Sequence, residues 1–122
     1  MTTPIPAPYK PSQLEKVNAV GAAGAAQTIA DPTGAGAYTI NRLVLSAAVC
    51  ALTFPAPQAG MSFTVELVQD ATGGRTVTWP ASVKWPAGTA PTLTTAASKA
   101  DVFSFMCSDG ATFRAFAAGL NF

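Results

Sequence analysis

The sequence predicts an all-β protein: an antiparallel β-sandwich or jelly-roll-like domain preceded by an extended, proline-rich N-terminal arm. Apolar and polar residues alternate with period two in several segments, and β-branched and aromatic residues are concentrated there. Gly- and Pro-rich turns separate these segments at short intervals. A chain of 122 residues has the length of one domain. We expect the β domain to span residues 27–122.

Residues 1–26 are expected to form the arm and a Gly/Ala-rich linker. Prolines remove amide donors and hold the first 13 residues near polyproline II; they are Pro4, Pro6, Pro8 and Pro11. Ser12 and Glu15 have the spacing of a capping box, which allows one or two helical turns after the arm. The small residues that follow bury little area, so we expect a linker leading into a short strand at residues 27–30.

The central part of the chain has strand-length apolar runs. One begins at Tyr38 and another extends from Val49 to Phe54, where Pro55 ends it. Residues 62–69 form the clearest predicted strand, because every second residue is apolar: Phe63, Val65 and Leu67.

Turn formers divide the last third into short strands. Gly73 and Gly74 predict a tight hairpin between residues 62–69 and 75–79. Residues 92–95 read as a further short strand. The segments 100–108 and 111–118 read as a final hairpin that is apolar on both faces. A strand that is apolar on both sides is buried on both sides, so we expect a neighbouring subunit to cover one face.

Composition argues against several classes of function. Charged residues make up 11% of the chain and the net charge is +1, with no basic patch of the kind that binds nucleic acid. The longest apolar run, Leu43–Phe54, is about half the length of a membrane-spanning helix. No signal peptide is evident at the N-terminus, so synthesis in the host cytoplasm is expected. Cys50 and Cys107 lie in apolar runs and are expected to be buried, reduced thiols.

Catalysis, a metal ion and a cofactor are not expected. The chain contains no histidine, so its Ser and Cys residues lack the usual general base. Asp70, Asp101 and Asp109 lie beside turn signals, where aspartate commonly accepts local hydrogen bonds, and no metal-ligand spacing recurs.

Trp79, Trp85 and Arg75 are the residues of a candidate ligand surface. Two indoles could stack on sugars, but each precedes a proline, and capping of the β core explains them more simply. Arg75 could contact a partner's carboxylate, although an arginine at a turn more often pairs with a nearby aspartate.

The stretch DATGGRTVTWPASVKWPAGTAPTLTT, followed by DVFSFMCSDGATFRA, resembles a β module of tailed-bacteriophage virion proteins. This module occurs at the ends of tail fibres and in small capsid-decorating proteins. The resemblance covers residues 62–116. It implies a virion location and a compact, mostly antiparallel β fold that is often trimeric.

Two functional hypotheses follow. The first is a capsid decoration (cement) protein, a homo-oligomer whose arm binds the major capsid protein and stabilises the shell. The alternative is a tail-fibre or tail-tip protein that contacts other tail proteins and recognises the host surface. In the first hypothesis, the residues expected to bind the partner are Pro4, Ile5, Pro6, Pro8, Tyr9, Lys10, Pro11 and Leu14.

Overall fold

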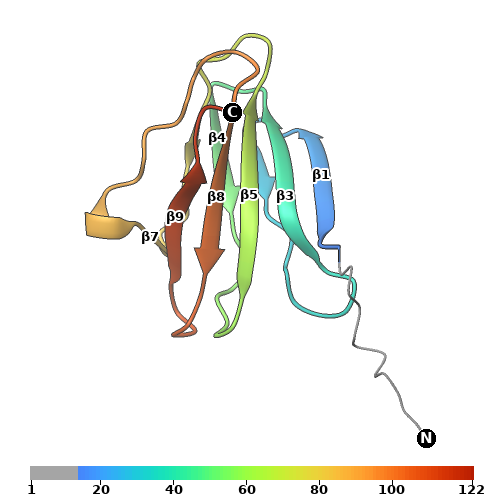
Figure 1. The fold of residues 1–122 in the computed structure, drawn as a ribbon, viewed down its shortest axis with the longest axis vertical. Coiled ribbons are helices and arrows are strands. Elements are labelled where there is room, and N and C mark those ends of the chain that lie inside the picture. The colour runs from blue at the N-terminus through green and yellow to red at the C-terminus, as the bar shows by residue number, and fades with distance from the viewer. Residues whose placement is uncertain (1–13) are drawn as a thin grey trace, which may run out of the picture.

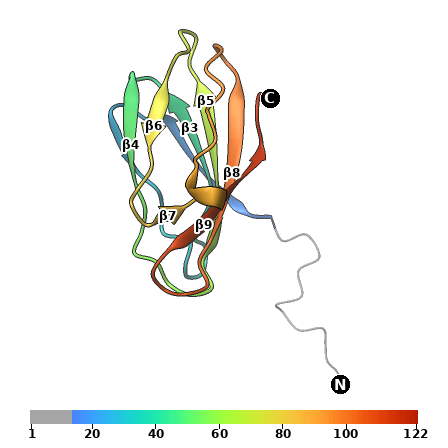
Figure 2. The same ribbon diagram turned by 90° about the vertical axis from the view of Figure 1, so that its left-hand side faces the viewer.

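The computed structural model describes residues 14–122, which form two β-sheets packed face to face (Figures 1 and 2). The larger sheet has six strands in the order β1-β3-β5-β8-β9-β7, and the smaller has three in the order β2-β4-β6. Within these residues the strands are β1 (Lys16–Ala22), β2 (Ala26–Thr28), β3 (Tyr38–Leu45), β4 (Val49–Thr53), β5 (Ser62–Gln69), β6 (Thr76–Thr78), β7 (Val83–Lys84), β8 (Ala100–Met106) and β9 (Phe113–Gly119). The all-β prediction is confirmed.

The chain alternates between the two sheets through its first six strands. Odd-numbered strands β1, β3 and β5 join the larger sheet, and β2, β4 and β6 form the smaller one. Among these six strands, neighbours within each sheet are therefore parallel, because every return to a sheet runs in the same direction. This part of the molecule is a stack of three coils, each with one strand in each sheet, so each coil contacts only its neighbours.

A short sequence pattern marks each coil. Every strand of the smaller sheet ends at a threonine, and the next residue is a large apolar side chain that packs in or against the core. The pairs are equally spaced along the chain: Thr28-Ile29, Thr53-Phe54 and Thr78-Trp79. The threonine faces solvent while the following side chain points inward, as period-two alternation requires.

An antiparallel hairpin completes the larger sheet. β5 pairs antiparallel with β8, and β8 pairs antiparallel with β9, so the predicted final hairpin is confirmed. The short strand β7 adds to β9 in parallel. The expectation of an antiparallel sandwich is wrong for the coiled part, because sequence periodicity reveals which side chains face inward but not which strands are neighbours.

The core lies between the two sheets and is rich in aromatic residues. β5 has the predicted bounds, and its side chains Phe63, Val65 and Leu67 are buried. Phe103 of β8 and Phe113 of β9 are fully buried against the same layer. Both cysteines are also buried in this core, as expected.

The expected linker is in fact largely a strand. Lys16–Ala22 forms β1, which pairs with β3 along its length, and no helical turn occurs in the described part of the arm or linker. An edge strand supplies backbone hydrogen bonds even where its side chains are small. The Asn18 amide also donates to the buried Oδ1 of Asn41 at 3.2 Å, which links the first two coils.

Two further expectations of the last third are corrected. The segment containing Gly73 and Gly74 does not close a hairpin, because β5 and β6 belong to different sheets and the segment passes from one to the other. Residues 92–95 are irregular rather than a strand. There, the Thr94 amide donates to the buried carboxylate of Asp101 at 2.7 Å instead of to a neighbouring strand.

Candidate functional site

The two tryptophans lie at the edge of the aromatic core. Trp79 and Trp85 meet edge to face with ring centroids 5.2 Å apart. Each also contacts Phe103, at 5.1 Å for Trp79 and 5.8 Å for Trp85. Both indoles are half-buried and pack against the core, a geometry that favours the capping role over a shared sugar-stacking platform.

The outer side of Trp85 lines a hollow of about 270 Å³, the Trp85 hollow, between residues 85–91 and β9. Pro86, Pro91 and Phe116 form most of its walls, and Thr89 contributes the one polar side chain among its described lining residues. A sugar site normally presents several converging polar groups. This hollow is therefore suited to an apolar occupant.

The end of the sandwich that carries residues 69–75 and 94–101, the loop end, is held by side-chain to backbone hydrogen bonds. Both the nitrogen and the oxygen of the buried Gln69 side-chain amide form hydrogen bonds. Its Nε2 donates to the carbonyls of Arg75 and Thr94 at 2.8 and 3.0 Å, and its Oε1 accepts from the Arg75 amide at 2.9 Å. These bonds fasten the two loops to the end of β5.

The guanidinium of Arg75 forms an ion pair within its own chain. Its Nη2 lies 2.9 Å from Oδ2 of Asp70, and its Nε donates to Oδ1 at 3.2 Å. Asp70 also accepts from the amides of Thr72 and Gly73, at 3.1 and 3.0 Å. The bidentate guanidinium, followed by these amides, lowers the pKa of the Asp70 carboxyl from its ordinary value of 3.8.

Asp109 and Asp101, like Asp70, each accept hydrogen bonds from backbone amides. Asp109, in the turn between β8 and β9, accepts from the amides of Ala111 and Thr112, both at 2.8 Å, and these bonds lower the pKa of its carboxyl. The buried Asp101 holds the amides of Thr94 and Asn121 at 2.7 and 2.9 Å. Within residues 14–122, no group of three or more metal-binding side chains is found.

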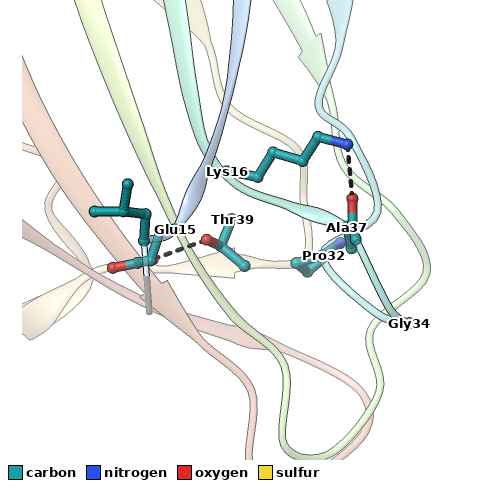
Figure 3. Close-up of a pocket in the computed structure, with 8 residues that line it drawn as sticks. Glu15, Lys16, Pro32, Gly34, Ala37 and Thr39 are labelled. Carbon is teal, nitrogen blue, oxygen red and sulfur yellow. Dashed lines mark hydrogen bonds between the residues drawn. The ribbon is translucent and has the colours of Figure 1, made fainter. Parts of the chain in front are cut away.

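The opposite end, the arm end, contains the start of β1 and a hollow of about 600 Å³, the arm hollow (Figure 3). Lys16 spans one side: its Nζ donates to the carbonyl of Gly36 at 3.2 Å and lies 4.7 Å from the ring centroid of Tyr38. On the other side, the Thr39 hydroxyl donates to Glu15 at 2.8 Å. Leu14 also lines this hollow and is 91% exposed.

A third depression of about 320 Å³, the sheet hollow, crosses the outer face of the larger sheet. Its described lining includes the exposed or half-exposed side chains of Thr64 on β5, Ser104 and Met106 on β8, and Phe116 on β9. The short hydroxyl side chains form its floor, whereas Met106 and Phe116 are 40% and 46% exposed.

Of the arm residues predicted to bind a partner, only Leu14 is within the described part of the chain. The others lie outside it: Pro4, Ile5, Pro6, Pro8, Tyr9, Lys10 and Pro11. The binding role of the arm stays a prediction.

Comparison with protein families identifies the module. The family described as "Putative phage tail fibre C-terminal domain" matches residues 9–112, most of the chain. The chain belongs to this family. No curated protein and no solved structure matches it. The family match supports the virion resemblance that the residues around the two Trp-Pro pairs suggest, and it identifies a structural component of a phage virion.

None of the helices in residues 14–122 has the length and apolar character needed to cross a bilayer.

Sequence reasoning missed the three hollows. Phe116 was noted only as part of a two-sided apolar strand, and its partners in the hollows come from distant segments. The one signal available was the apolar outer face of the last two strands. That signal indicates that the face is covered, but it does not show where on the face the hollows lie.

Proposed function

We propose that this chain is the recognition domain of a tail-fibre protein and contacts the host surface. The observation that carries the proposal is the family match to a tail-fibre C-terminal domain over residues 9–112. The capsid-decoration hypothesis depends on the arm, which lies outside the described residues, and the family match favours the tail-fibre alternative. An enzymatic role has no support in the described residues, where Asp70, Asp109 and Asp101 accept hydrogen bonds from backbone amides.

The loop end is the surface we assign to host contact. It lies at the end of the sandwich opposite the start of β1 (Figure 1). Its two loops fix each other directly: the Gly74 amide donates to the Thr95 carbonyl at 2.8 Å and the Ser98 amide donates to the Asp70 carbonyl at 3.1 Å. Loops held on a rigid scaffold lose little conformational entropy on binding. The exposed side chains of Thr72 and Lys99 are available there for contact.

Assembly as a homotrimer is part of the proposal and rests on family analogy. Large apolar side chains that are exposed in the single chain support it, because such side chains are commonly buried in an oligomer interface. They include Val17, Val49, Leu120 and Phe122. Sedimentation of the purified protein at micromolar concentration should give the mass of three chains, and a monomer would count against self-sufficient assembly.

Competition for phage adsorption tests the recognition role. Purified protein should slow adsorption of the phage to host cells, and Thr72→Arg should weaken that effect because it adds a bulky charge to the loop end. Thr53→Arg is the matched control, since it places the same side chain on the exposed face of the smaller sheet. Failure of the unmodified protein to slow adsorption would contradict the proposal. Equal effects of the two substitutions would contradict the assignment of the loop end.

A further inference from the structure

The three hollows adjoin one another, and together they are called the track. The arm hollow and the sheet hollow share Glu15 and Thr39, and the sheet hollow and the Trp85 hollow share Phe116. The track therefore starts where the described chain begins, beside Leu14. It crosses the strands of the larger sheet and ends at the Trp85 hollow.

Strand register shows how the track runs. On the outer face, three residues that line the sheet hollow, Thr64, Ser104 and Phe116, are successive register partners on β5, β8 and β9. They lie in a row across the sheet, perpendicular to the strands. The row ends at the apolar Phe116, and its other two members carry short hydroxyl side chains. A slender apolar segment that crosses the strands would fit this shape.

The arm has the sequence of such a segment. Polyproline II has three residues per turn, so every third side chain lies on one ridge. Ile5, Pro8, Pro11 and Leu14 are spaced at that interval and are all apolar. Proline-rich segments of this kind dock in aromatic-lined grooves because their backbone is already extended before binding.

The repeat of the arm matches the spacing of the strands. One turn of polyproline II advances about 9.3 Å, and two inter-strand spacings span about 9.6 Å. A polyproline II arm that ran back from Leu14 across the sheet would place Pro11 over β5, two strands along from β1, and Pro8 over β9 beside Phe116. One more turn would place Ile5 at the Trp85 hollow beyond β9.

We propose that residues 5–14 of the arm lie across the larger sheet of their own chain, with the ridge of Ile5, Pro8 and Pro11 seated in this track. The arm then covers the outward-facing side chains of Met106 and Phe116. This inference concerns the fold of the chain and does not depend on the proposed host recognition. It competes with the sequence-based hypothesis that the same arm residues bind another virion protein.

A pair of introduced cysteines tests the seating directly in the full chain. Ala7→Cys combined with Ala117→Cys places one thiol beside Pro8 and the other on the wall of the Trp85 hollow. Mild oxidation should give a disulfide within one chain. The control pair, Ala7→Cys with Ala26→Cys, uses an exposed alanine of the smaller sheet and should react much more slowly. Equal rates for the two pairs would overturn the proposal. A disulfide between two chains would also overturn it and would assign the track to the arm of a neighbouring copy.

Proteolysis gives a second readout that needs no cysteine. Chymotrypsin cleavage after Tyr9 should be slow in the unmodified protein. Phe116→Ala should speed it about tenfold, the change that follows from losing an anchor worth about 1.4 kcal/mol. Val49→Ala is the control, because Val49 is similarly exposed but lies on the smaller sheet. Cleavage at the same rate in all three proteins would overturn the proposal.

Discussion

The loop end and the arm end of the sandwich are stabilised in different ways. At the loop end, the side chains of Gln69, Asp70 and Asp101 each hold backbone amides or carbonyls of the neighbouring loops. The arm end has one open hollow, and two more lie along the larger sheet, where the side chains of Met106 and Phe116 are exposed. Polar groups are satisfied at the loop end, whereas apolar surface is left uncovered from the arm end across the larger sheet.

This difference separates two kinds of surface. A loop whose hydrogen bonds are made within the chain keeps its shape before any partner arrives, as a recognition surface requires. An exposed apolar face commonly marks an interaction site, and here the arm, another copy of the chain or both would bury it. If the loop end is the more rigid of the two, substitutions that disturb its hydrogen bonds or close contacts should lower the free energy of unfolding more than their matched controls.

The largest effect is expected at Gly73. A Cβ atom there would lie 2.6 Å from the carbonyl oxygen of Thr95 and 2.9 Å from the amide of Ala97, at a φ of +73°. Gly73→Ala should lower the free energy of unfolding by about 3 kcal/mol, because the two loops must separate. Gly74→Ala is the matched control: its φ is +72°, but nothing lies within 4 Å of its added Cβ. It should cost only about 1 kcal/mol for the left-handed backbone. Urea denaturation measures both, and equal losses would show that the loops are not locked together.

Gln69→Leu should have the next largest effect. It leaves the Arg75 amide and two carbonyls without their partners in a buried site, which should cost about 2 kcal/mol. Gln58→Leu, on an exposed turn, should change stability by less than about 0.5 kcal/mol. A Gln69→Leu protein as stable as the parent would mean that packing alone fixes the loop end.

Individual strands and local turns could largely be predicted from the sequence. Alternation in residues 62–69 gave β5 with its correct bounds, and the apolar runs with the Ser108–Gly110 turn gave the hairpin of β8 and β9. Pairing of Arg75 with a nearby aspartate was the simpler of two expectations, and the structure identifies that aspartate as Asp70. These features depend on local patterns, which a single sequence displays.

Strand neighbours and the hollows could not be predicted in this way. The parallel coils bring together residues more than 20 positions apart, such as Asn18 and Asn41, and periodicity carries no information on such pairs. The equally spaced pairs Thr28-Ile29, Thr53-Phe54 and Thr78-Trp79 were the available sign of a repeat. β1 was missed because the spacing of Ser12 and Glu15 favoured helical turns and the Gly- and Ala-rich residues favoured a linker, whereas backbone pairing at a sheet edge overrides such local signals.

Acid should weaken the loop end through Asp70. The pKa of this carboxyl is lower in the folded protein than its ordinary value of 3.8, because Arg75 and two amides favour the charged form. Its contribution to stability is therefore present above about pH 4 and is lost as the pH falls through the lowered pKa. Asp70→Asn should lower stability at neutral pH and flatten the decline in stability below pH 4. An unchanged acid profile in the variant would show that the pair with Arg75 contributes nothing.

Position in the virion tests the central claim most directly. Gold-labelled antibody against this protein, viewed on intact phage particles by electron microscopy, distinguishes the tail fibres from the capsid shell. The tail-fibre assignment predicts gold at the fibres. Gold distributed over the capsid would contradict it and would support the capsid-decoration hypothesis.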